Sequence, residues 1–267
     1  MLQTGAKPIK FPLAMSLGIV AIVIISLNYF GQDYLVLASN ALNLGIIVPF
    51  VAFSLILTVR NKVTGSMGKA WICFAVFAVS WSIGEVIWAA DELIFHKDPF
   101  PSIADFFWLL GYPAYFGFAM SYIKPFKNSI SAKIIALAVS VSVALMVFMV
   151  YCAITKSDLG GFETALLTSY PVGDAICLAP TLIGLALFFR GQVNFTWLLL
   201  LLGMFSFVVA DSAYQILSQS DQYYTGHPSD IVYIWAYVFF AFGAYHHLTV
   251  FRVQNQESRF HDQENFR

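Results

Sequence analysis

Long apolar stretches, separated by short polar segments, dominate the chain. A helix needs about 20 mostly apolar residues to cross the hydrocarbon core of a membrane. The pattern predicts eight such helices, over residues 11–30, 35–59, 70–94, 104–123, 134–154, 171–189, 195–217 and 230–251. We therefore expect an all-α, polytopic helical bundle in which residues 1–267 form a single integral membrane domain embedded in the lipid bilayer.

Basic residues predict the orientation of this bundle, because cytoplasmic loops are enriched in Lys and Arg. With the N-terminus inside, twelve of the fourteen basic residues fall in inner segments, and only Lys97 and Lys156 fall in outer loops. An even number of spans then places both termini in the cytoplasm, with residues 252–267 as a cytoplasmic tail.

Composition supports this class and excludes others. Hydrophobic residues make up 59% of the chain and charged residues only 11%, whereas soluble domains carry about 25% charge. A net charge of −1 without a basic run excludes nucleic acid as a partner. The three cysteines lie in apolar stretches and form neither a disulfide framework nor a metal knuckle. Phosphate loops and hydrolase motifs are missing from the sequence, so we expect no enzyme, no cofactor and no metal site.

The acidic residues indicate an internal repeat. Glu85 is followed 20 residues later by Asp105, and Asp211 is followed 19 residues later by Asp230. Residues 70–123 and 195–251 are thus predicted to be equivalent helical hairpins, with 134–189 as a third copy that keeps only Asp174. The copies would be parallel repeats, and residues 11–59 would be an added helix pair.

Ionisable residues inside a membrane span are costly and indicate a functional site by default. Glu85 and Asp211 lie within predicted spans, while Asp105, Asp174 and Asp230 stand at the outer starts of theirs, so all five share one depth. Tryptophans and tyrosines recur beside them at helical spacing. We predict an outward-opening acidic and aromatic cavity that binds a small ligand or cation. Its residues are Glu85, Asp211, Trp88, Asp105, Trp108, Tyr112, Asp174, Tyr214, Asp230 and Tyr233.

Purely structural interpretations stay open for the same acids. Proline followed by an acid is an ordinary helix start, which covers Asp105, Asp174 and Asp230, and Ser102 with Asp105 has the spacing of a capping box. Glu85 and Asp211 have the alternative of tying helices together by polar contacts.

Two adjacent histidines, His246 and His247, lie near the inner end of the last span. We expect them to reach toward the membrane interface with their polar ends. A redox protein that uses one of them is an alternative.

Residues 101–113, PSIADFFWLLGYP, resemble a pattern of multi-pass prokaryotic membrane sensor regions, which often precede GGDEF, EAL or histidine kinase domains. Similar fragments recur at 170–174, 210–211 and 227–230, so the resemblance covers roughly residues 70–250. It implies a signal-input role in a prokaryotic cell membrane, with Asp105, Asp174, Asp211 and Asp230 at matched positions. No output domain follows here, which implies a separate signalling or membrane protein partner.

The sequence thus predicts an integral membrane sensor or receptor-like module. The alternatives are a proton- or cation-coupled transporter and an accessory subunit of a membrane complex.

Overall fold

The computed structural model describes residues 9–61, 64–156, 160–189, 191 and 193–265, without the side chains of Lys156 and of 251–265. Helices make up 88% of the chain, and these residues contain no strand. The eight α-helices are α1 Lys10–Phe30, α2 Leu35–Arg60, α3 Gly65–Leu93, α4 Ile103–Ile123, α5 Ala132–Lys156, α6 Gly161–Phe188, α7 Asn194–Gln219 and α8 Asp230–Asn265. Short 3-10 helices, Gln32–Tyr34 and Lys124–Ser129, precede α2 and follow α4. The predicted number of helices is confirmed.

Seven of these helices, all except α4, are long and apolar enough to cross a membrane. The chain is therefore compatible with a multi-pass membrane protein. The remaining helix, α4, has 21 residues and carries Asp105 in its first turn and Pro113 in its interior. Several of the charges used to predict the orientation, Lys7, Lys62, Asp158, Arg190 and Arg267, lie outside the described residues.

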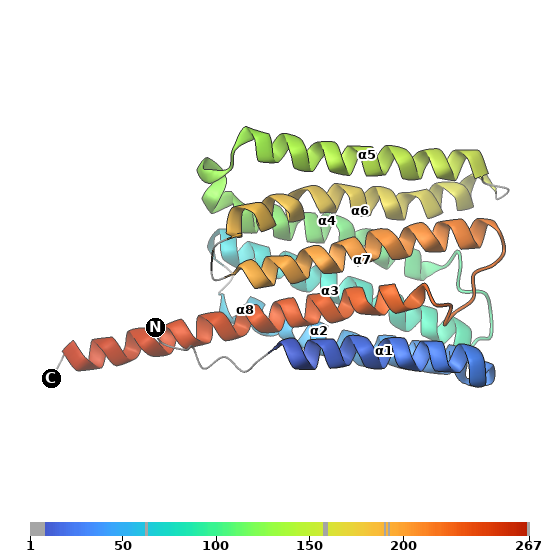
Figure 1. Cartoon of the computed structure of the whole chain (residues 1–267), viewed down its shortest axis with the longest axis horizontal. Coiled ribbons are helices and arrows are strands. Elements are labelled where there is room, and N and C mark those ends of the chain that lie inside the picture. The colour runs from blue at the N-terminus through green and yellow to red at the C-terminus, as the bar shows by residue number, and fades with distance from the viewer. Residues whose placement is uncertain (1–8, 62–63, 157–159, 190, 192, 266–267) are drawn as a thin grey trace.

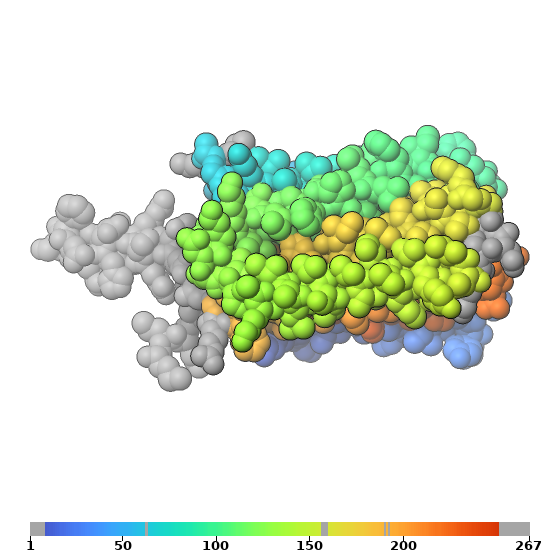
Figure 2. Space-filling view, turned by 90° about the horizontal axis from the view of Figure 1, so that it is seen from above, coloured from blue at the N-terminus to red at the C-terminus, as the bar shows by residue number. Residues whose placement is uncertain are grey.

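The helices run side by side along one axis (Figure 1). The most extensive helix contacts are α3 with α4, α7 with α8 and α5 with α6, which are the three predicted hairpins. Helix α2 packs against both α3 and α8, whereas α1 contacts mainly α8 and α2. Helix α5 forms an outer layer over α6 (Figure 2). The hairpins are thus packed pairs, and their relation as repeats stays a prediction.

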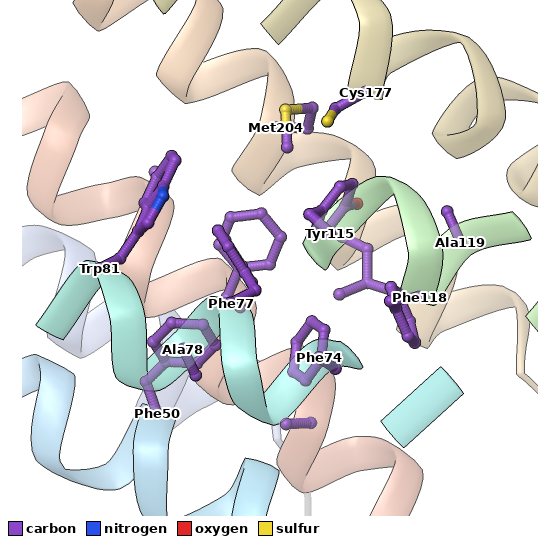
Figure 3. Close-up of a cluster of buried hydrophobic side chains, with 14 of the residues drawn as sticks. Phe50, Phe74, Phe77, Ala78, Trp81, Tyr115, Phe118, Ala119, Cys177 and Met204 are labelled. Atoms are coloured by element: carbon purple, nitrogen blue, oxygen red, sulfur yellow. The ribbon is translucent and has the colours of Figure 1, made fainter. Parts of the chain in front are cut away.

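An aromatic core fills the middle of the bundle (Figure 3). The Phe77 ring meets Trp81 and Tyr115 edge to face, with ring centroids 4.8 and 5.1 Å apart. Such edge-on pairs are favoured by the charge distribution of aromatic rings. Phe207 and Tyr237 continue this core toward the end of the bundle that carries the 94–102 and 220–229 connections. We call this the cavity end.

Helix α6 differs from its predicted span. It begins at Gly161 rather than at Pro171, which lies inside the helix together with Pro180. The segment before Pro171 buries Leu167 and Tyr170 against the bundle, and neighbouring helices allow a proline to be accommodated inside a membrane helix. Asp174 is therefore in the interior of α6, so its interpretation as a first-turn acid was wrong.

The opposite end of the bundle corrects one further expectation. The apolar span of α8, Asp230–Val250, agrees with the predicted span 230–251, and the helix continues beyond it to Asn265, past the other helices (Figure 1). His247 is buried, with its ring 4.5 Å from that of Trp71, so it does not reach the membrane interface. The imidazole of His247 packs against the rings of Trp71 from α3 and Tyr122 from α4, whose centroids lie 4.5 and 5.7 Å away, and this aromatic packing takes the place of the expected interfacial position. His246 instead contacts Thr196, with 2.8 Å between Nδ1 and Oγ1.

Candidate acidic and aromatic site

A cavity of about 70 Å³ lies between α2, α3, α4, α6, α7 and α8 at the cavity end. Nine of the ten residues singled out in the sequence line it, from four helices: Glu85, Trp88, Asp105, Trp108, Tyr112, Asp211, Tyr214, Asp230 and Tyr233. The tenth, Asp174, is not part of the lining. The acids and their aromatic neighbours on these helices therefore face one cavity. Ligand binding by these residues stays a prediction.

Close contact between α3 and α4 positions two of the lining tryptophans. A Cβ atom at Gly111 would come within 1.9 Å of Nε1 of Trp81, and one at Gly84 within 2.7 Å of Nε1 of Trp108. Each indole thus crosses to the partner helix over a glycine. Trp81 also donates a hydrogen bond of 2.7 Å to the carbonyl oxygen of Trp108. These contacts fix the wall of the cavity.

Tyrosine hydroxyls hold the carboxylates that line the cavity. Tyr237 of α8 donates to Oε1 of Glu85 at 2.5 Å, and Tyr112 of α4 donates to Oδ2 of Asp211 at 3.0 Å. Tyr233 donates to the other oxygen of Asp211. All three bonds connect different helices. The acids therefore tie the helices together, as the structural interpretation expected for Glu85 and Asp211.

The two acids at helix starts also have structural roles. Ser102 and Asp105 form the predicted capping box: Oγ of Ser102 accepts from the amide of Ala104, and Asp105 accepts from the amide of Ser102. This arrangement satisfies amides at the start of α4. Asp105 additionally accepts a hydrogen bond from Tyr170.

Asp230, the first residue of α8, holds the preceding connection in place. It accepts from the amide of Gly226 at 2.8 Å and from Tyr223 at 3.2 Å. Both acids at helix starts thus combine a structural role with a place in the cavity wall.

Helix α2 supplies amides that the sequence reasoning missed. Nδ2 of Asn43 donates to Oε2 of Glu85 at 3.0 Å, and Nδ2 of Asn40 donates to Glu92 at 2.6 Å. Oδ1 of Asn43 is buried and has no hydrogen-bond partner in the described part of the chain. Asn40 and Asn43 are three residues apart in an otherwise apolar helix, and this spacing could have indicated that one face of α2 contacts the site.

Asp174 lies behind the cavity wall. Its side chain is 0% exposed, and neither of its oxygens has a hydrogen bond of ordinary geometry among the described residues. Asp211 and Tyr112 are the polar groups that face it. Burying a carboxyl group costs free energy unless it is well hydrogen-bonded, and Asp174 bears this cost next to Asp211, behind the cavity wall.

The cavity is lined by acidic groups, and the described residues of its wall include no basic group that could pair with them. Four carboxyl groups line it, and its lining contains no Lys, Arg or His. The ion pair between Lys97 and Asp91, at 3.1 Å, lies outside it. Among the described residues, no three His, Cys, Asp or Glu side chains lie close enough to share a metal ion.

A wider vestibule of about 640 Å³ adjoins the cavity. The two spaces share four lining residues: Trp88, Tyr214, Tyr223 and Thr225. Glu92 fixes this boundary, because it accepts hydrogen bonds from Thr225 of the α7–α8 connection and from Asn40 of α2. Burial, followed by the charge of Asp230, raises the pKa of Tyr223 well above its usual range. Tyr223 therefore remains a hydrogen-bond donor at neutral pH.

Several lining residues had no usable signal in the sequence. Tyr223 and Thr225 come from the α7–α8 connection, whose path depends on how the helices pack. Tyr170 lies in residues 170–174, one of the fragments that resemble membrane sensor regions, but the residue to which it donates a hydrogen bond, Asp105, is 65 residues away in sequence. Such pairs follow only from the assembled bundle.

The chain matches no protein-family model, no curated protein and no solved structure.

Proposed function

We propose that this protein is a sensor or receptor-like module of a prokaryotic cell membrane, which binds a small ligand or cation in the cavity from the outer side. The observation that supports this most is the convergence of Glu85, Asp105, Asp211 and Asp230 on one aromatic-walled space without a basic residue. Buried charges are normally paired, so an unpaired anionic site favours a cationic or hydrogen-bond-donating ligand.

Signal transfer would use the hydrogen bonds that link the hairpins. Glu85 joins α3 to α8, and Asp211 joins α7 to both α4 and α8. A ligand that competes for these carboxylates would change how the helices are held together, since a ligand shifts the conformation in which it binds more tightly. A separate membrane or signalling protein would receive this change.

A screen by thermal unfolding tests the proposal. Purified protein in mild detergent should unfold at a higher temperature with a bound ligand, because a ligand of the folded state stabilises it by mass action. The Glu85→Gln variant should lose this shift. Asp33→Asn, at an exposed position of the α1–α2 connection, is the matched control and should keep it. A ligand shift that is unchanged in Glu85→Gln would contradict the assignment of the cavity.

A cation-coupled transporter is the second candidate. Asp174 favours it, because this buried acid lies beyond the cavity wall, next to Asp211, where a transported proton or cation would pass. Counterflow uptake of the identified ligand into proteoliposomes separates the two functions. Uptake that Asp174→Asn abolishes would support transport, and binding without uptake would support the sensor.

A further inference from the structure

We propose that the ligand of this cavity is a small alkylammonium ion, of the size of tetramethylammonium, rather than a metal ion, a zwitterion or a neutral molecule. The inference deepens the proposed function and rests on it. It draws on the hydrogen-bond donors around the carboxylates, the aromatic walls and the volume of the cavity.

The donors around the carboxylates suit their ionised form. An ionised carboxylate only accepts hydrogen bonds, whereas an amide N–H group only donates. One oxygen each of Glu85, Asp105 and Asp230 faces an amide: that of the Asn43 side chain, the Ser102 backbone and the Gly226 backbone, respectively. The polar side of the cavity is therefore arranged for negative charge, which a bound cation would neutralise.

A metal ion does not fit this arrangement. Calcium takes six to eight oxygen ligands, and magnesium demands six in near-octahedral geometry. The carboxylates instead lie on separate helices, each held by its own tyrosine or amide, and no three of them lie close enough together to share a metal ion among the described side chains. The cavity offers dispersed negative charge rather than a tight oxygen cage.

Aromatic rings provide the second half of the recognition. The ring centroid of Trp88 lies 5.5 Å from that of Trp108 and 6.3 Å from that of Tyr214, and all three side chains line the cavity. The faces of such rings attract cations, and cages of this kind recognise alkylated ammonium groups. Because aromatic side chains also bury apolar surface, they favour an ion that carries methyl groups over a strongly hydrated one.

Volume limits the ligand to a few atoms. A cavity needs about 10–15 Å³ of probe-occupied volume to hold one water, so a cavity of about 70 Å³ has room for a small ligand of several non-hydrogen atoms. Tetramethylammonium has five non-hydrogen atoms. Amino acids and other zwitterions would bring a carboxylate next to four others, without a basic residue to receive it.

The vestibule has the charge expected of an entrance for cations. It is lined by Glu92, Asp98, Glu163 and Asp221, against a single lysine, Lys97. Clefts lined predominantly by one sign of charge concentrate ions of the opposite sign and speed their association. The vestibule meets the cavity at Trp88 and Tyr214, so an entering cation reaches the aromatic cage first.

Isothermal titration calorimetry of the protein in nanodiscs of uncharged lipid tests the inference. Tetramethylammonium chloride is the probe, and tert-butanol is its neutral analogue of similar size. Sodium, potassium and calcium chlorides at matched ionic strength represent the metal ions. We expect saturable binding of tetramethylammonium at least about tenfold tighter than that of tert-butanol, in keeping with the loss of a cation–aromatic and charge interaction.

Two variants locate the binding. Asp211→Asn and Trp108→Leu should each weaken tetramethylammonium at least about tenfold. Asp33→Asn, at an exposed position of the α1–α2 connection outside the cavity and the vestibule, is the control, and it should change the affinity less than about threefold at physiological salt because exposed charges are screened. Helical circular dichroism and the unfolding midpoint of each variant establish that it is folded.

Each other outcome overturns the alkylammonium assignment. Equal affinity for tert-butanol would identify a neutral ligand, and calcium or potassium binding that Asp211→Asn abolishes would identify a metal ion. Both results would leave the proposed ligand-binding function standing. Absence of binding by every probe to folded wild-type protein would refute the alkylammonium class, and a positive thermal-shift screen would then show that the function survives without it.

Discussion

Gly111→Ala is the substitution for which the structure gives the sharpest expectation. The new Cβ atom would lie 1.9 Å from Nε1 and 2.2 Å from Cδ1 of Trp81, whereas ordinary contact begins at 3.4 Å. The indole cannot retreat easily, because it is 3% exposed and packs 4.3 Å from the ring of Phe207. Its hydrogen bond to the carbonyl of Trp108 would be broken as it moves.

The cost follows from these two effects. Overpacking a filled core costs about 1–3 kcal/mol and a lost hydrogen bond about 1 kcal/mol, so Gly111→Ala should destabilise the protein by about 2–4 kcal/mol. The assay is the midpoint of thermal unfolding in mild detergent, followed by circular dichroism. Ligand binding should weaken in parallel, since Trp81 lines the cavity.

Gly45→Ala is the matched control for this substitution. Gly45 also lies inside a helix, but a Cβ atom there would meet no heavy atom within 4 Å. Its midpoint should stay the same or rise slightly, because alanine is the better helix former. If Gly111→Ala unfolded at the same temperature as Gly45→Ala, the proposed contact between Trp81 and α4 would be refuted.

Further predictions concern the acids and the connections at the cavity end. Asp174→Asn should unfold at the same or a higher temperature than wild type, because neither carboxyl oxygen has a hydrogen bond of ordinary geometry among the described residues. Asp211→Asn should unfold at a lower temperature, because it loses the bonds from Tyr112 and Tyr233, and a reversed order would contradict the hydrogen-bond assignment. Ser102→Ala should cost about 1 kcal/mol by removing the cap of α4, and an unchanged midpoint would count against the capping box. Thr225→Val should speed amide hydrogen exchange in residues 220–229, because it removes the hydrogen bond from Thr225 to Glu92. Equal exchange rates in the variant and the wild type would show that this bond does not hold the α7–α8 connection in place. Burial lowers the pKa of His227, so its contribution to stability is present above the unfolded pKa of about 6.5 and is lost as the pH falls through the folded pKa. His227→Gln should therefore reduce the loss of stability of the protein over this pH range. An unchanged dependence of stability on pH would exclude His227 as its cause.

The helical bundle was predictable because membrane spans are encoded locally. Runs of apolar residues of a fixed length define the helices, so all eight were found and most of their starts lie within a few residues of the observed ones. The exception, α6, shows the limit of local signals: Pro171 looks like a helix start, but the tertiary contacts of Leu167 and Tyr170 carry the helix ten residues further back.

The site was predictable in part for the same reason. Helical spacing places Asp105, Trp108 and Tyr112 on one face, and shared depth then brings such faces together. Tyr112 and Tyr233 were predicted to line the cavity, but which donor pairs with which carboxylate was not predictable, because partners such as Tyr237 and Glu85 are 152 residues apart in sequence. Their pairing depends on the lateral order of the helices, which no local pattern specifies.

Protection of an introduced cysteine tests the central claim most directly. Ser39 is buried in the cavity wall, so Ser39→Cys, in a background where Cys73, Cys152 and Cys177 are replaced by alanine, places a small thiol beside the proposed site. The measurement is its rate of modification in sealed cells by a membrane-impermeant thiol reagent, with and without tetramethylammonium. Ser220→Cys, exposed at the same end, is the control.

We predict that Ser39→Cys reacts from outside the cell and that tetramethylammonium at ten times its dissociation constant slows the reaction about tenfold, as mass action requires. Ser220→Cys should react at the same rate in both conditions. Failure of Ser39→Cys to react from outside, or an equal rate with the ligand present, would contradict an outward-facing cavity that binds this cation.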